Sequence, residues 1–339
     1  MSCTSGNLSL PQHFLGRITL LLAALFSQCV LAPLASHAAD RVSVCYGSAS
    51  SALLPIARDQ GFFKAEGIEI DLRPYTSGKN SIQAMLDRKC DLATGAQAVV
   101  VHHSLRRRDF LVVANLSISD DFEKIVVRSD RGINGPADLR GRRIALPEFT
   151  TQHYLLDTYL LSNGLELQDV QRVYLHHNEV LKAFQRGEVD GLVHREPEIR
   201  QLLAEFGGKA KILPSRSLCV SAYLLAGKRD FVQKNPAVIK RVLRALLRAE
   251  DYAKKEPAKA RNIAARTYGA DQEEIKKIWG LHNYRVSLDQ SLFLLLENMA
   301  RWEIGLQPPA QRAPMPNYLE FLYLDGLKAI RPEAVTIIH

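Results

Sequence analysis

The sequence predicts an α/β protein made of two lobes of similar design, because one pattern occurs twice. Residues 84–91 (AMLDRKCD) and 183–190 (AFQRGEVD) both begin with Ala, continue with a large apolar residue and end with Asp. In each copy a short amphipathic helix turns at a basic residue or glycine and then enters an apolar strand, at 92–94 or 191–193. Solenoid repeats recur every few tens of residues, so this longer spacing favours two lobes. Small molecules commonly bind in the cleft between two such lobes.

A first lobe is predicted from strands that alternate with helices, the pattern of βαβ units and parallel sheets. Strands are expected at 42–46, 68–72, 91–94 and 110–116, and helices at 53–66, 81–86 and 100–105. The first of these helices ends at Gly67, since glycine commonly terminates helices. Residues 124–127 then lead out of the lobe.

A second lobe is predicted to start at the turn-rich segment 130–135. Strands are expected at 143–146, 172–175, 191–193 and 210–213, and helices at 151–162, 180–184 and 197–206. The helix at 151–162 stops at Asn163-Gly164.

The long apolar strand 218–225 is expected to carry the chain back to the first lobe. The chain would then cross between lobes twice, near 127–130 and 216–220, as a hinged clamshell requires. We therefore assign 39–128 together with 219–339 to the first lobe, and 129–218 to the second. The C-terminal region is helical, with helices expected at 236–254, 257–268, 271–281, 287–304 and 318–327.

The N-terminal segment 1–38 is predicted to be a secretory signal peptide. An uncharged apolar run at 18–35 follows Arg17 and ends in small residues, with a cut expected after Ala38. A membrane anchor is the alternative, but Ser27, Gln28 and Pro33 interrupt a run that is already short for a bilayer. We therefore expect an exported, periplasmic protein.

The formal net charge of +8 does not predict nucleic-acid binding. The basic residues are spread along predicted helices, for example 240–248 and 254–266, and apolar residues separate them. A nucleic-acid interface would gather them with aromatic residues in one patch. We expect a solvated basic face and no nucleic-acid partner.

Three cysteines follow the signal peptide, namely Cys45, Cys90 and Cys219, and they permit at most one internal disulfide. All three lie in or beside predicted strands, so we favour three buried thiols over a structural bridge. The pairs His102-His103 and His176-His177 do not predict a metal site, because adjacent side chains point apart. No metal and no cofactor are expected.

Four loops that follow predicted strands carry small polar residues at the starts of helices. Ligands of open α/β sheets bind at the carboxyl ends of the strands, where backbone N–H groups and hydroxyls converge on an anion or carbonyl. The alternative is that these residues only cap helices. The candidate ligand-binding residues in the four loops are Ser48 and Ser50; Ser77 and Gly78; Gly95 and Gln97; and Thr150, Thr151 and Gln152.

Several segments resemble one family of exported solute-binding proteins of ABC importers. Residues 61–68 (GFFKAEGI) are similar to its GFF..EG signature, and residues 136–144 (PADLRGRRI) to its P.DLKGK.I segment. Residues 165–170 with the second repeat copy, Glu196-Pro197, and the segment 231–236 also match its motifs, so the likeness runs from about residue 42 to 249. This branch, described as NMT1/THI5-like, serves nitrate, taurine, aliphatic sulfonates and thiamine-precursor pyrimidines.

The resemblance implies the two-lobed type II periplasmic-binding fold and a role in import. It also implies a small-molecule solute as ligand, a membrane ABC permease with its ATPase as partner, and a monomer.

The sequence departs from the family just before Glu196-Pro197, where the family usually has Trp and this chain has Arg195. A guanidinium suits a carboxylate, sulfonate or phosphate. Arg195 and Glu196 therefore join the candidate ligand-binding residues, and an anionic organic solute is expected. The alternative is that Arg195 pairs with Glu196 or Glu198 and leaves the solute to others.

The sequence does not predict an enzyme, because it contains no GxSxG, HExxH or P-loop motif. Fold alone leaves open an enzyme on the same scaffold, with His153 or His177 beside Glu148 or Glu179 as an acid–base pair. A ligand-sensing module that acts through a membrane receptor, and a binder of a neutral pyrimidine, are further alternatives.

Overall fold

The computed structural model describes residues 1–2, 4, 6 and 39–338. The apolar run 18–35 and the predicted cut after Ala38 lie outside these residues. Among the described helices, none combines the length and hydropathy needed to span a membrane.

The first sheet has six strands in the order β11-β4-β10-β3-β1-β2. These are β1 (Asp40–Tyr46), β2 (Ile68–Pro74), β3 (Leu92–Ala96), β4 (Phe110–Ser119), β10 (Ser221–Lys228) and β11 (Asn283–Ser287). Strand β1 pairs in parallel with β2 and β3, whereas β10 lies antiparallel between β3 and β4. All eight residues of β10 are buried, which explains the apolar run at 222–226 within it.

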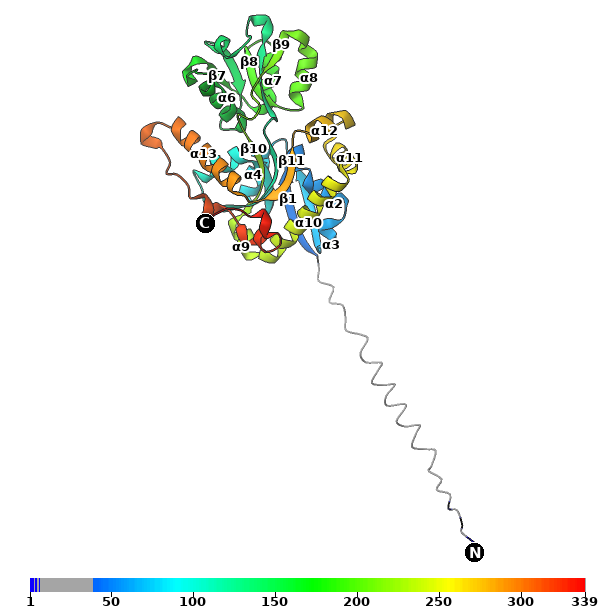
Figure 1. Ribbon diagram of the computed structural model, residues 1–339. Coiled ribbons are helices and arrows are strands. Elements are labelled where there is room, and N and C mark those ends of the chain that lie inside the picture. The colour runs from blue at the N-terminus through cyan, green and yellow to red at the C-terminus, as the bar shows by residue number, and fades with distance from the viewer. Residues whose placement is uncertain (3, 5, 7–38, 339) are drawn as a thin grey trace. The chain divides into compact units, whose positions relative to one another are not determined.

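The second sheet has five strands in the order β7-β6-β8-β5-β9 and forms the upper lobe in Figure 1. These are β5 (Glu123–Arg128), β6 (Arg143–Leu146), β7 (Gln171–Tyr174), β8 (Gly191–Arg195) and β9 (Ala210–Leu213). Strand β6 is parallel to β7 and β8, and β5 is antiparallel to both of its neighbours.

The two-lobed α/β architecture is confirmed, and the predicted parallel pairing occurs between β1, β2 and β3 and between β6, β7 and β8, although reversed strands make both sheets mixed. The reversed strands are β5 in the second sheet and β10 and β11 in the first. Strands β5 and β10 are the first strands after the two crossings between lobes, and each enters its sheet from the end where the parallel strands of that sheet finish.

The helices flank both sheets (Figure 1). Those around the first sheet are α2 (Leu53–Asp59), α3 (Phe62–Ala65), α4 (Gly78–Leu86), α5 (Gln97–Ser104), α9 (Arg229–Lys234), α10 (Pro236–Lys255), α11 (Pro257–Tyr268), α12 (Gln272–Trp279), α13 (Gln290–Leu306) and α14 (Leu324–Lys328). Those around the second are α6 (Thr151–Ser162), α7 (His177–Gln185) and α8 (Glu198–Phe206). The single helix expected at 53–66 is instead two helices, separated at Gly61 with a φ of 68°. Strand β11 was not expected from the sequence.

The first crossing between the lobes lies at 120–122, between β4 and β5, and not at 127–130 as predicted. Strand β5 therefore belongs to the second sheet, and the lobe boundary placed at residue 128 is one strand too late. Apolar runs precede and follow the crossing, so the sequence does not reveal which sheet each joins. The second crossing lies at 214–220, in the region that the sequence indicated.

The repeated pattern has the same structural task in both lobes. Asp91 accepts a hydrogen bond from the backbone N–H of Ser43 at 2.8 Å, and its own N–H donates to the Ser43 carbonyl at 3.1 Å. Asp190 makes the matching pair of bonds with Arg143, at 3.0 and 2.8 Å. Each aspartate thus anchors the turn after a repeat helix to a neighbouring parallel strand.

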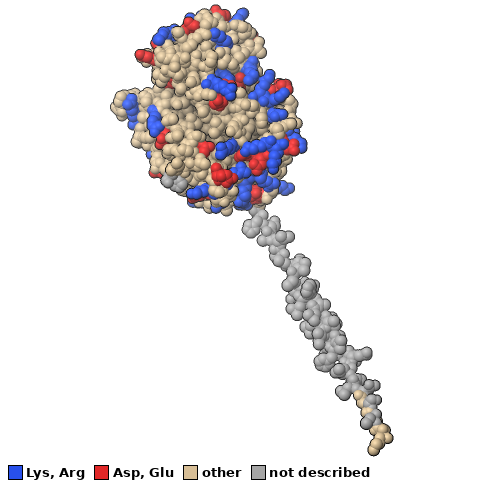
Figure 2. All heavy atoms as spheres, in the orientation of Figure 1, with Lys and Arg blue, Asp and Glu red and all other residues tan. Residues whose placement is uncertain are grey.

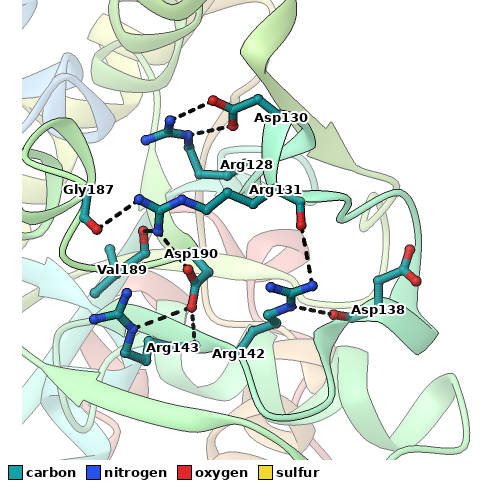
Figure 3. Close-up of polar contacts among 9 residues, drawn as sticks. All are labelled: Arg128, Asp130, Arg131, Asp138, Arg142, Arg143, Gly187, Val189 and Asp190. Atoms are coloured by element: carbon teal, nitrogen blue, oxygen red, sulfur yellow. Dashed lines mark hydrogen bonds and ion pairs between the residues drawn. The ribbon is translucent and has the colours of Figure 1, made fainter.

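The second copy adds charged partners. The Asp190 carboxylate also receives the guanidinium of Arg131 at 2.7 Å and lies 3.4 Å from that of Arg143 (Figure 3). Although burial opposes the charge, the bonds from Arg143 and Arg131 lower the pKa of Asp190.

Cys45 and Cys90 form a disulfide, so the prediction of three buried thiols is wrong. The two cysteines lie on or just before the adjacent strands β1 and β3, with 6.0 Å between their Cα atoms. That distance is within the usual range for disulfides. The sequence shows neither the strand order nor this proximity. Cys219 remains a free, buried thiol.

The basic residues are interleaved with acidic ones over the lower part of the surface in Figure 2. Arg244 pairs with Glu66 at 2.7 Å and Arg266 with Asp59 at 3.1 Å, which links α10 and α11 to the segment around α2 and α3. This mixed surface fits the expected solvated basic face.

Candidate functional site

A cavity of about 640 Å³ is lined by loops from both sheets. The first sheet contributes the loop before α4, the end of β10 and the segment before β11. The second contributes the loops that follow β6, β7 and β8, and residues of the first crossing complete the wall. The lining residues are Ser50, Thr76–Asn80, Ala96, Ala98, Val99, Ser117, Phe122, Glu123, Pro147–Gln152, Tyr174–Glu179, Arg195, Ser221, Tyr223 and His282.

Seven of the candidate ligand-binding residues lie in this wall and four do not. Those in the wall are Ser50, Ser77, Gly78, Thr150, Thr151, Gln152 and Arg195. Those outside it are Ser48, Gly95, Gln97 and Glu196.

Three of the residues outside the wall are engaged in packing or pairing, and the fourth, Ser48, has a buried hydroxyl beside the Tyr223 phenol. The Gln97 amide donates to the Val220 carbonyl and accepts from the Ala222 N–H, both at 2.9 Å, so it fixes the end of the second crossing. A Cβ atom on Gly95 would lie 2.6 Å from Ile82, so glycine is needed for packing against α4. Glu196 lies 3.3 Å from Arg200.

Two of the hydroxyls in the wall are helix caps. The Ser77 hydroxyl accepts from the Asn80 N–H at 3.2 Å at the start of α4. The Thr150 hydroxyl donates to the Pro147 carbonyl at 2.7 Å and accepts from the His153 N–H, at the start of α6. Ser77 and Thr150 therefore act as helix caps, which is the alternative role considered for these loop residues.

The neighbouring Thr151 differs from these caps. Its side chain is buried and its hydroxyl has no hydrogen-bond partner among the described residues. A buried polar atom without a partner is destabilising, so this hydroxyl is available for a ligand atom.

Tyr223 is a wall residue that the sequence did not indicate, because it lies within the apolar run of β10. Its phenol oxygen is buried, and burial raises its pKa, an effect that the neighbouring Ser48 hydroxyl partly opposes. A Cβ atom on Gly78 would lie 2.6 Å from this oxygen, so glycine is required there. The phenol is a neutral donor in the wall.

His282 and Ser50 also contribute to the first lobe's side of the cavity. The Ser50 hydroxyl and the His282 Nε2 atom are 3.4 Å apart. Burial lowers the pKa of His282 to about 4, so the ring is neutral near pH 7. Its Nδ1 atom has no partner among the described residues.

Glu123 lies where the first crossing meets the second. Its carboxyl group accepts a hydrogen bond from the Ser221 hydroxyl, and both residues line the cavity. Burial raises the pKa of Glu123, which favours its protonated form relative to a carboxyl in water. The sequence did not indicate a role for Glu123, because this residue precedes an apolar run and its surroundings are typical of a turn.

Arg195, at the end of β8, lines the cavity and also approaches an acidic neighbour. Its Nε atom lies 3.6 Å from Glu198, whereas Glu196 pairs with Arg200. The Arg195 side chain is 17% exposed, and no hydrogen bond from its guanidinium is found among the described residues. Arg195 therefore both lines the cavity and lies beside a glutamate, as the two interpretations of the sequence separately proposed.

Residues 49–260 match the family model described as NMT1/THI5 like. The chain belongs to the NMT1/THI5-like family. The matched segment includes every loop of the cavity wall except the one that carries His282.

Curated relatives of this NMT1/THI5-like protein include binding proteins of Gram-negative bacteria. The taurine-binding periplasmic protein of Escherichia coli is 27% identical over 219 residues, which cover 62% of this chain and 66% of the relative. The putative aliphatic sulfonates-binding protein of Escherichia coli is 24% identical over 254 residues, covering 74% and 79%.

Solved structures confirm the periplasmic-binding fold. The alkanesulfonate-binding protein SsuA from Xanthomonas axonopodis pv. citri, bound to MOPS, superposes with a TM-score of 0.70 at 18% identity, covering 84% of this chain and 98% of SsuA. The desulfurization enzyme DSZB superposes with a TM-score of 0.58 at 16% identity, covering 86% and 100%. The fold therefore hosts both binding proteins and enzymes.

Proposed function

We propose that this NMT1/THI5-like protein is the solute-binding protein of an ABC importer and captures a small organic anion in the cavity. Family membership and the sulfonate- and taurine-binding relatives support this role. The signal-peptide pattern supports export to the periplasm, where a monomer would deliver the solute to a membrane permease and its ATPase.

The observation that carries the proposal is the position of Arg195 in the cavity wall, with Tyr223 and Thr151 also lining it. Arg195 supplies a positive charge and a forked donor, while the Tyr223 phenol is neutral and the Thr151 hydroxyl has no hydrogen-bond partner among the described residues. Such a set suits the acidic head of a sulfonate or carboxylate.

The remaining wall favours an organic solute over an inorganic anion. Aromatic and apolar side chains surround the polar groups, including Phe122, Phe149 and Tyr174. The volume of about 640 Å³ lies within the range of about 300–1,000 Å³ typical of sites for drug-sized ligands. A solute with an acidic head and an apolar body would contact both the polar groups and the apolar wall, whereas nitrate would contact only the polar groups.

We further propose that the two lobes move relative to each other about the crossings at 120–122 and 214–220. In this division residues 39–119 and 221–339 form one lobe and residues 123–213 the other. A solute held by both lobes binds the closed form better and shifts the population toward it.

A thermal-shift screen of the mature protein, residues 39–339, tests the proposal. Taurine, longer alkanesulfonates, aromatic sulfonates, carboxylates, nitrate and a thiamine-precursor pyrimidine are compared, because a ligand of the native state raises the melting temperature. A sulfonate or carboxylate hit that is recovered chemically unchanged supports the proposal. Conversion of the hit would establish an enzyme instead, and a response to the pyrimidine alone would exclude the anionic solute.

A further inference from the structure

Three side chains beside the cavity bring ligand atoms for a metal ion together. His177 starts α7, His194 lies in β8 and Glu198 starts α8. One nitrogen of each histidine and one carboxylate oxygen all lie within 4.8 Å of one another. The sequence did not indicate this group, because the two histidines are 17 positions apart and meet only through the pairing of elements in the second lobe.

Each of the three side chains has one buried polar atom without a hydrogen-bond partner among the described residues. These atoms are the Nε2 atom of His177, the Nδ1 atom of His194 and the Oε2 atom of Glu198. His194 is only 1% exposed. Buried polar atoms are nearly always hydrogen-bonded, so three orphaned atoms at one point indicate a missing partner that all of them share.

The hydrogen bond of His194 prepares its ring for a metal. Its Nε2 atom lies 3.2 Å from the His177 carbonyl, so Nε2–H donates to this oxygen and Nδ1 carries the free lone pair. Metal-binding histidines generally hold their second nitrogen in this way.

The rings of His177 and His194 stack, with 4.0 Å between their centroids and 24° between their planes. Because an imidazole binds a metal through the in-plane lone pair of a ring nitrogen, the cation would lie at the edge of this stack, beside the two nitrogen atoms and the Glu198 carboxylate, and not between the ring faces.

We propose that His177, His194 and Glu198 bind one divalent transition-metal cation, with zinc as the best match. Two imidazole nitrogens and a carboxylate form a set that zinc accepts with a fourth position left open. Calcium and magnesium prefer sites made of oxygen ligands. Bond lengths of about 2.0–2.1 Å require ligand atoms about 3.4 Å apart, so small side-chain rotations would complete the site.

The charge of Arg195 bears directly on this site, because Arg195 is adjacent to His194 and 3.6 Å from Glu198. It opposes a cation, while the Glu198 carboxylate favours one and has a second oxygen free for it. His177 and Arg195 both line the cavity, so the open position of the metal would be on the solute side. The site itself rests on these contacts and not on the identity of the solute.

Calorimetric titration of the tag-free, chelator-treated mature protein with zinc chloride tests the site. We expect one zinc per chain, and an affinity lowered at least about tenfold in each of His177→Gln, His194→Gln and Glu198→Gln, because even outer-shell changes commonly weaken metal binding about 10–100-fold. His103→Gln is the matched control, since it removes an imidazole of α5 outside the cavity wall and should leave zinc affinity unchanged. Substitution with cobalt(II) should give the absorption bands of a four-coordinate ion.

His194 is buried, so circular dichroism must first show that each variant folds. Glu198→Gln is the decisive variant if His194→Gln does not fold, because Glu198 is 29% exposed. The proposal is overturned if the wild-type protein binds no stoichiometric zinc. It is equally overturned if Glu198→Gln and His177→Gln bind zinc as tightly as the His103→Gln control.

Discussion

Trp302 donates its indole N–H to the carboxylate of Asp157 at 2.9 Å, and this bond joins the two lobes away from the crossings. Trp302 belongs to α13 of the first lobe and Asp157 to α6 of the second. Asp157 also receives Arg172 at 2.7 Å, and the rings of His153 and Tyr154 lie 5.0 and 5.3 Å from the indole. A buried carboxylate, a cation and aromatic rings packed edge to face thus form an interlobe contact.

Trp302→Phe should weaken this contact and keep most of its apolar packing. The variant leaves Asp157 with one fewer partner, so we expect the free energy of unfolding to fall by about 1–3 kcal/mol in urea titrations. We also expect weaker solute binding if the contact belongs to the closed form.

Trp279→Phe is the control, because Trp279 packs on Tyr284 within the first lobe. The chain has two tryptophans, so this control leaves Trp302 as the only fluorophore of its type. Solute should then change the Trp302 emission. An unchanged emission at saturating solute would mean that the α6–α13 contact does not respond to binding.

Arg195→Ala should remove about 2–5 kcal/mol of affinity for an acidic solute, the usual effect of truncating one side of a buried charge pair. Arg195→Lys should also bind poorly, because an ammonium cannot reproduce the forked donor. Thr151→Ala should lose about 0.5–1.5 kcal/mol, as expected for one neutral hydrogen bond. Calorimetric titration with the screening hit measures all three.

Thr150→Ala provides the contrast, because its hydroxyl caps α6. We expect it to lower the free energy of unfolding by about 1 kcal/mol while solute affinity changes less than in Thr151→Ala. Equal, small losses of affinity at Arg195, Thr151 and Thr150 would show that Arg195 serves only to pair with Glu198.

The sequence predicted the elements whose signals are local. The helix start at Thr150, the stop at Asn163-Gly164 and the apolar strands depend on neighbouring residues, whereas α4 begins at Gly78, three residues before its predicted start. The repeat also predicted two similar lobes, because Asp91 and Asp190 anchor equivalent turns.

The features that the sequence missed depend on contacts between distant residues. The Cys45–Cys90 bond requires β1 and β3 to be neighbours, and the meeting of His177 with His194 requires α7 to pack beside β8. Tyr223 lies in a buried strand, where its phenol is hidden among apolar residues. Its role in the cavity follows only from the position of β10 between β3 and β4.

Asp190→Ala should destabilise the protein more than Asp91→Ala. Removing Asp190 leaves Arg131 and Arg143, whose side chains are 30% and 45% exposed, without their partner; loss of one side of a fully buried pair costs about 3–5 kcal/mol, and because water reaches these guanidinium groups we expect about 3 kcal/mol. Removing Asp91 deletes the hydrogen bonds that its carboxylate accepts from the Ser43 N–H and hydroxyl, with an expected loss of about 1–3 kcal/mol. Urea titrations of both variants give the comparison, and an equal or larger loss for Asp91→Ala would contradict it.

His153 should make the free energy of unfolding fall as the pH drops from about 6.5 to 4. Its side chain is 1% exposed, and burial lowers its pKa to about 4. Asp157 and Glu303 oppose this lowering of the pKa, whereas Arg172 adds to it. The Tyr174 hydroxyl lies 3.2 Å from the Nε2 atom of His153, and Trp302 packs on the His153 ring.

The sign follows from proton uptake. An unfolded chain binds a proton at His153 near pH 6.5, whereas the folded protein binds it only near pH 4, so acid favours the unfolded state between these values. One such group changes the free energy of unfolding by up to about 1.4 kcal/mol per pH unit. His153→Gln should therefore show a shallower decline across this window, measured by urea titrations at several pH values. His176→Gln, at an exposed histidine, is the control and should keep the wild-type slope. If the free energy of unfolding falls as steeply with pH in both variants as in the wild type, His153 does not contribute to the acid sensitivity.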